Sequence, residues 1–119
     1  MKTSVLNDKS FVFAIRIVNL YKYLFESKNE KVLSKQLLRS GTAIGALISE
    51  GKYAESKLDF IHKYGIAQKE CSETEYWIKL SYKTTYLSEN EYNSLIFDNT
   101  ELMKLLTSSI ITAKKTLKK

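Results

Sequence analysis

The sequence predicts an all-α fold, an antiparallel up-down-up-down four-helix bundle formed by a single domain over residues 1–119. Three observations support this fold. The chain has no proline and only four glycines, so little interrupts long helical segments. Apolar residues recur with the 3.6-residue period of amphipathic helices. Two capping boxes, Ser56 to Asp59 and Ser88 to Glu91, mark helix starts after short connections, which favour antiparallel neighbours.

The first helix is expected from about Asp8 to Ser27. Its inward face is predicted at positions with helical spacing: Phe11, Ala14, Val18, Tyr21 and Phe25, flanked by Phe13, Ile17, Leu20 and Leu24. Three further apolar residues, Val12, Ile15 and Tyr23, fall among the polar positions of the same helix. A helix that is apolar beyond one stripe has a second surface to cover. We therefore expect Val12, Ile15 and Tyr23 to form an interface between subunits.

The second helix is expected from about Glu30 to Lys52 and contains Gly41 and Gly45, one turn apart, within a run of small residues. An interior glycine costs a helix about 1 kcal/mol relative to alanine. Retaining two of them requires an offsetting gain. The pattern therefore predicts that another helix approaches the backbone closely at these two positions.

The third and fourth helices each carry a regular apolar stripe. The third, expected from about Lys57 to Tyr86, has a stripe close to the seven-residue rhythm of bundles: Phe60, Tyr64, Ala67, Cys71, Thr74, Ile78 and Tyr82. The fourth, which follows the second capping box, has this buried stripe: Tyr92, Leu95, Ile96, Leu102, Met103, Leu106, Ile110, Ala113 and Leu117. These stripes predict one shared core.

Basic residues are unevenly distributed, and the net formal charge is +6. Residues 1–63 carry eleven basic and six acidic groups, residues 64–113 carry four and seven, and the last six residues add Lys114, Lys115, Lys118 and Lys119. Such an uneven distribution of charge can attract the phosphate backbones of nucleic acids. The first candidate contacts are Lys31, Lys35 and Arg39, at four-residue steps, followed by Arg16, Lys22 and the C-terminal lysines. The alternative interpretation is that these cations only solubilise exposed helix faces.

Catalytic signatures are weak, and we expect no enzyme activity, cofactor or metal. Glu70 and Glu73 share one side of the third helix, but carboxylate metal sites in bundles need accompanying histidines, and the only histidine is His62. We expect both glutamates to form structural charge pairs with basic residues such as Arg39 or Lys35. Cys71, the only cysteine, lies on the predicted core stripe without a neighbouring base and cannot form an internal disulfide.

Several segments together resemble the bacterial four-helix-bundle family encoded within intervening sequences of large-subunit ribosomal RNA genes. The resemblance covers nearly the whole chain. It is carried by residues 9–18, 33–46, 49–50, 59–61, 69–77 and 101–108. Two positions depart from the pattern of that family, which usually has asparagine where this chain has Leu47 and often serine where it has Ala43.

This resemblance implies a homopentamer. A related branch of the family serves as accessory protein to diversity-generating retroelements and is similar in being basic and associated with nucleic acid. The absence of a signal-peptide-like or membrane-spanning apolar run leads us to expect a cytoplasmic protein without membrane contact.

Two functional hypotheses follow from the sequence. The first is a non-enzymatic oligomer that binds RNA or DNA electrostatically, with little sequence specificity, because no recognition motif is visible. The alternative is an oligomeric scaffold or adaptor that binds another protein through Val12, Ile15 and Tyr23.

Overall fold

The computed structural model describes the backbone of residues 2–117 and the side chains of residues 5–117. It contains α1 (Lys2–Lys22), a π-helical turn η1 (Tyr23–Ser27), α2 (Leu33–Gly51), α3 (Lys57–Lys83) and α4 (Glu89–Leu117). No strand occurs in this described part of the chain. The predicted all-α class is confirmed, although α1 begins six residues earlier than expected and ends in a π-helical turn.

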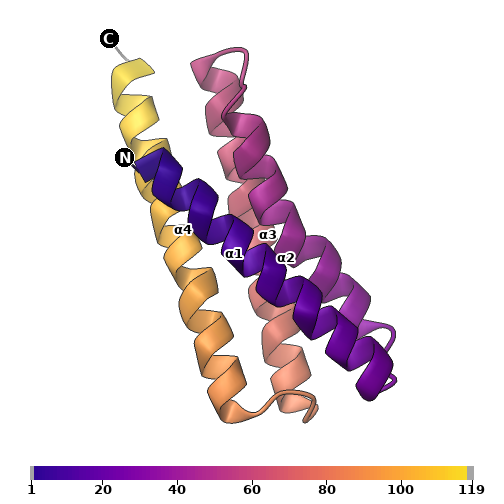
Figure 1. The fold of residues 1–119 in the computed structure, drawn as a ribbon. Helices are drawn as coiled ribbons and strands as arrows, with labels where there is room; N and C mark the ends of the chain where they lie inside the picture. Colours follow the sequence, from indigo (N-terminus) through magenta and orange to yellow (C-terminus); the bar gives the residue numbers. More distant parts are fainter. Residues whose placement is uncertain (1, 118–119) are drawn as a thin grey trace.

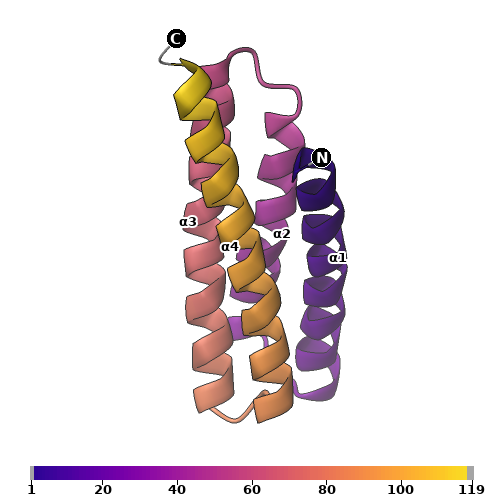
Figure 2. The same cartoon turned by 90° about the vertical axis from the view of Figure 1, so that its left-hand side faces the viewer.

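The four helices alternate in direction and form an elongated bundle with extents of 52 × 22 × 20 Å (Figure 1). The α1–α2 and α3–α4 connections lie at one end, and the α2–α3 connection lies at the other end (Figure 2). This arrangement is the predicted antiparallel up-down-up-down bundle. None of the helices within residues 2–117 is long and apolar enough to cross a membrane.

The core is formed by apolar side chains from all four helices. The predicted stripe of α3 is confirmed over Tyr64, Ala67, Cys71, Thr74 and Ile78, all buried. The buried apolar residues are Leu6, Phe13, Ile17, Leu24, Leu37, Ile44, Ile48, Tyr64, Ala67, Cys71, Ile78, Leu87, Leu95, Leu102, Leu106, Ile110 and Ala113. Burial of this shared surface is the main favourable term in folding.

The prediction that Phe11 faces inward is wrong, because this residue is 67% exposed. The buried residues of α1 are Leu6, Ser10, Phe13 and Ile17, so the helix turns the predicted flank at Phe13 and Ile17 toward the core. Because α1 is apolar on almost every side, its periodicity does not determine which side faces the core. Leu117 is also misassigned: it is 44% exposed at the last residue of α4, where the bundle ends.

The close approach predicted at the two glycines is confirmed. A Cβ atom built on Gly41 would lie 2.8 Å from Ile17 Cγ1, and one built on Gly45 would lie 3.3 Å from the Ser10 carbonyl oxygen. Both glycines therefore let α1 lie directly against α2. The gain that offsets their helix-propensity cost is this contact with α1.

Two helix starts have the predicted capping boxes. The Ser88 N–H donates to Glu91 Oε1 at 2.8 Å, and the Glu91 N–H donates to Ser88 Oγ at 3.1 Å, so the box of α4 is reciprocal. At α3 the Asp59 N–H donates to Ser56 Oγ at 3.0 Å, while the Asp59 carboxylate accepts from the Glu55 N–H instead of that of Ser56. Both boxes satisfy amides that a helix start leaves unpaired.

The start of α2 is capped by the buried side chain of Glu30. Its carboxylate accepts from the N–H groups of Ser34 at 2.7 Å and Val32 at 3.2 Å, and the Ser34 hydroxyl donates to the Glu30 carbonyl. Burial by itself raises the pKa of Glu30, but the backbone N–H groups of Ser34, Leu33 and Val32 outweigh it and hold this pKa below its ordinary value. The ionised form therefore stabilises the connection between α1 and α2.

One polar contact lies inside the core between α3 and α4. The side-chain amide of Asn99 is buried and donates to the Cys71 carbonyl oxygen at 2.9 Å. A directional bond in an otherwise apolar layer favours one axial alignment of the two helices over others.

The fit at Gly41 predicts opposite effects for two glycine-to-alanine substitutions. Gly41→Ala should lower the free energy of unfolding by about 1 kcal/mol, because the strain of overpacking against buried Ile17 exceeds the gain in helix propensity. Gly65→Ala is the matched control, since a Cβ on Gly65 meets no atom within 4 Å; it should raise stability by up to about 1 kcal/mol. Urea denaturation measures both. Stabilisation by Gly41→Ala would contradict the close-packed contact.

The cap of α2 predicts a pH-dependent loss of stability. A carboxylate with a lowered pKa in the folded state contributes stability above its unfolded pKa, and that contribution is lost as the pH falls through the folded value. Glu30→Gln should therefore lower the free energy of unfolding by about 1 kcal/mol at pH 7, and the deficit should shrink below about pH 4. Glu26→Gln, at an exposed glutamate four residues earlier, is the control and should change little. A deficit that is equal at pH 7 and pH 3 would argue against capping by the ionised form.

Candidate nucleic-acid interface

Four lysines gather where α1 ends and α2 begins, at one end of the bundle. Lys22 is in the last turn of α1, Lys28 and Lys31 flank the connection, and Lys35 is in the first turns of α2. All four are exposed, and none forms an ion pair with any residue of 5–117. We call these four lysines, together with Tyr23 and Phe25, the basic-aromatic end.

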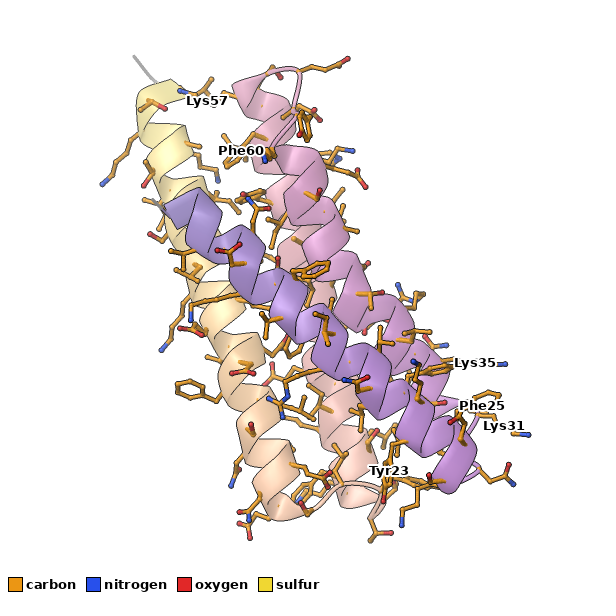
Figure 3. The ribbon with its side chains drawn as sticks, viewed as in Figure 1. Tyr23, Phe25, Lys31, Lys35, Lys57 and Phe60 are labelled. Carbon is orange, nitrogen blue, oxygen red and sulfur yellow. The ribbon has the colours of Figure 1, made fainter. Side chains whose placement is uncertain are left out.

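Each aromatic ring of the basic-aromatic end has lysine ammonium groups over it. Lys31 Nζ and Lys35 Nζ lie 5.4 Å and 5.9 Å from the centroid of the Phe25 ring. Lys28 Nζ lies 5.7 Å from the centroid of the Tyr23 ring. These distances are within the range of cation–π attraction. Figure 3 shows Lys35, Phe25 and Lys31 together, with both lysines extending outward.

The local backbone explains how these side chains reach the surface. In η1 the Lys28 N–H donates to the Tyr23 carbonyl at 3.3 Å, the wider spacing of a π-helical turn. Leu24 is fully buried and anchors the turn, while Tyr23 is 43% exposed. Asn29 then takes a positive φ of 54°, a conformation that asparagine tolerates better than most residues. Glu30 fixes the following start of α2, which positions Lys31 just before this helix and Lys35 within it.

Arg39 does not join Lys31 and Lys35 as an unpaired cation. Its guanidinium donates to Glu70 at 3.4 Å and also to Glu73 on α3. The Trp77 indole N–H, 3.0 Å from Glu73 Oε2, and the Arg39 guanidinium hold the pKa of Glu73 below its ordinary value. The candidate charge pairs Glu70 and Glu73 are thus brought together with Arg39 in a clamp between α2 and α3.

Arg16 is also paired with a carboxylate. Its guanidinium donates to Asp98 of α4 at 2.8 Å, and Lys9, two turns earlier on α1, pairs with Glu101 at 3.2 Å. These contacts join α1 to α4. Arg16 and Arg39 therefore have local partners for their charge, whereas Lys22, Lys31 and Lys35 do not.

The last turn of α4, which carries Lys114 and Lys115, lies at the opposite end of the bundle from the α1–α2 connection (Figure 1). Lys114 and Lys115 are exposed in the last turn of α4, and Lys118 and Lys119 lie outside the described residues. Lys57, labelled at this end in Figure 3, donates to Thr116. The basic-aromatic end thus holds Lys31 and Lys35, two of the three first candidates, together with Lys22, while Arg16 and Arg39 lie between the two ends of the bundle.

The candidate interface residues Val12 and Ile15 lie on the outer side of α1, 58% and 48% exposed. Phe11, exposed beside them, lines a groove of about 840 Å³ between α1 and α2, whose floor includes Ala14, Gly45 and Ala46. Tyr23 is separated from this surface, because η1 places it beside Lys28 at the basic-aromatic end. We call Phe11, Val12 and Ile15 the outer α1 surface.

The other titratable candidates have no partners for chemistry. Cys71 is buried, and burial raises its pKa to about 12, so the thiolate is scarcely populated at neutral pH. His62 is exposed on α3. Within the described residues, no three His, Cys, Asp or Glu side chains come together in a group that could hold a metal ion.

The sequence pattern did not indicate Lys28 and Phe25 as members of a surface cluster. Phe25 was placed on the inward face of the first helix, and Lys28 lies in a connection outside any helical spacing. The available signal was a pair of aromatic residues, Tyr23 and Phe25, within a segment that carries four lysines between residues 22 and 35.

Comparison with known proteins finds a solved structure and a family model that each match most of this chain. No curated protein matches it. A crystal structure of a protein with unknown function, from the S23 ribosomal protein family of Bacteroides thetaiotaomicron, is 54% identical, with a TM-score of 0.91 over 92% of this chain and 98% of that one. Residues 2–108 match the family described as 23S rRNA-intervening sequence protein. The chain therefore belongs to the 23S rRNA-intervening sequence protein family.

Proposed function

We propose that this chain forms an oligomer that binds RNA or DNA electrostatically, with little sequence specificity and without catalysing a reaction. The observation that carries the proposal is the basic-aromatic end, where Lys22, Lys28, Lys31 and Lys35 have no carboxylate partner among the described residues. Unpaired lysines bind phosphates by releasing counterions, a contribution that does not depend on base sequence.

The basic-aromatic end keeps a net positive charge despite two acidic residues. Residues 22–35 contain four lysines and two glutamates, which gives a formal net charge of +2. The carboxylate of Glu30 is buried and accepts from backbone amides at the start of α2, and Glu26 is exposed. Farther along the bundle, ion pairs such as Arg39 with Glu70 neutralise cations locally. The four lysines of this end form no such pair with any residue of 5–117, so their charges remain available to phosphates.

The descriptions of the relatives indicate which nucleic acid to test first. The description of the matched family names 23S rRNA, and the description of the similar structure names a ribosomal protein family. Both descriptions support RNA as the first ligand, with DNA as the comparison.

Assembly would increase the effect of each weak contact. We propose that copies of the chain associate through the outer α1 surface, because Phe11, Val12 and Ile15 are exposed apolar residues beside a groove lined by small residues that a helix can enter. The family resemblance implies five copies. Several basic-aromatic ends held in one particle would bind a long strand with higher avidity than one end alone.

Charge reversal at Lys31 and Lys35 tests the nucleic-acid proposal. The double variant Lys31→Glu with Lys35→Glu should weaken RNA binding about tenfold or more at about 0.1 M salt, and should reduce the slope of log affinity against log salt by about 1 to 2. Fluorescence anisotropy with a labelled oligonucleotide across a salt series measures both. Lys69→Glu with Lys104→Glu is the matched control, since both lysines are exposed and the change in charge is the same. Equal weakening by the two pairs would contradict a local site.

Neutral substitutions on the outer α1 surface test assembly. Val12→Gln with Ile15→Gln should shift the native mass from an oligomer to a monomer, because they remove apolar area without adding charge. Leu58→Gln with Ile111→Gln alters equally exposed apolar residues elsewhere and should leave the mass unchanged. Native mass spectrometry with and without nuclease gives the readout. A monomeric unmodified chain would refute the assembly, and an intact oligomer that binds no nucleic acid would favour the protein scaffold.

A further inference from the structure

We propose that the basic-aromatic end selects single-stranded nucleic acid over duplex by stacking bases on Tyr23 and Phe25. This inference rests on the proposed function and specifies its ligand. The lysines supply affinity for phosphates of any strand. The rings supply the part that distinguishes unpaired bases from paired ones.

The lysine contacts indicate that one face of each ring can be reached from solvent, although Tyr23 is 43% exposed and Phe25 is half-buried. An ammonium group is strongly hydrated and stays near water, so its position over a ring marks a face that the core does not cover. Lys28 lies over Tyr23, and both Lys31 and Lys35 lie over Phe25. Tyr21 contacts Phe25 with ring centroids 5.4 Å apart and supports it from within α1. A base can therefore reach these faces without unfolding the helix.

When a base takes the place of a lysine ammonium group over a ring, no charged group is left without a partner. The base provides a π surface in place of the ammonium group, and the phosphate attached to the same nucleotide pairs with the displaced lysine. Base–aromatic stacking tolerates any sequence, because every base has such a face. The juxtaposition of ring and lysine thus suits one repeating unit, a base with its phosphate.

A duplex cannot use the rings in this way. Its bases are stacked on one another and expose only their edges in the grooves. The lysines can contact duplex phosphates, but Tyr23 and Phe25 then contribute nothing. We therefore expect the duplex to bind through the lysines alone, and more weakly.

The shape of η1 explains why the two rings lie apart. Tyr23 and Phe25 flank Leu24, whose burial fixes the turn against the core. Because the three residues are consecutive and Leu24 faces inward, the rings on either side emerge at the end of α1 in different directions. A strand that contacts both rings must pass around this end, and a flexible single strand can do so more easily than a stiff duplex.

The test measures binding of a labelled 12-nucleotide single-stranded RNA, a single-stranded DNA of the same sequence, and a duplex closed at both ends by loops. Tyr23→Leu should weaken binding of both single strands about five- to tenfold and leave the closed duplex unchanged, while Tyr23→Phe should bind as the unmodified protein does. Phe25→Leu should act in the same direction as Tyr23→Leu.

A second tyrosine provides the matched control. Tyr53 is 78% exposed and has Lys52 Nζ 5.7 Å from its ring centroid, but it lies at the other end of α2. Tyr53→Leu should leave all three affinities unchanged. Weakening equal to that of Tyr23→Leu would overturn the assignment to the basic-aromatic end.

The outcomes separate this inference from the proposed function. If charge reversal at Lys31 and Lys35 weakens every ligand while Tyr23→Leu and Phe25→Leu weaken none, the inference fails and the function stands. An effect of Tyr23→Leu confined to RNA or to DNA would also overturn stacking, which does not involve the sugar hydroxyl. If no oligonucleotide binds at low salt, the proposed function fails as well.

Discussion

The close contact between α1 and α2 is the constraint on which the rest of the structure depends. Gly41 and Gly45 have no side chain to hold the two backbones apart. Ile17 and the Ser10 carbonyl therefore lie directly against α2. This contact selects which side of an almost uniformly apolar α1 faces the core. It thereby leaves Phe11, Val12 and Ile15 exposed and fixes where Tyr23 and Phe25 emerge. A larger residue at either glycine would disturb the core and both surfaces together.

Basic residues between the ends of the bundle and those at the α1–α2 connection have different partners. Between its ends, Arg16 pairs with Asp98 and Arg39 with Glu70 and Glu73, so these cations connect helices. At the α1–α2 connection, Lys28, Lys31 and Lys35 have aromatic rings beneath them instead of carboxylates beside them. Arginine suits the first role because its planar group can bond two carboxylates at once. Lysine suits the second because its flexible stem lets the charge move between a ring and an incoming anion.

Most features that depend on local sequence are predictable. Among those that depend on packing, the close approach at Gly41 and Gly45 is predictable from the cost of interior glycines, but the choice of a face on α1 is not. The capping box at Ser88 and the stripe of α3 follow from neighbouring residues alone, and both are present. Phe11 was misplaced because periodicity cannot choose a face on a helix with apolar residues on all sides. The contact of Asn99 with the Cys71 carbonyl needs the relative position of two helices, which no pattern within one helix encodes. For the candidate site, the four-residue spacing identified Lys31 and Lys35, but their relation to Phe25 depends on the π-helical turn.

The buried position of Cys71 gives the molecule a single sulfhydryl that reagents in solvent cannot reach while the bundle is closed. Thiol-specific dyes should therefore not react with Cys71 under native conditions, and should react with it only when α3 and α4 separate. A second cysteine engineered at the surface would be the only one labelled, so Cys71 would not have to be replaced. The slow modification of Cys71 in turn measures how often α3 and α4 separate.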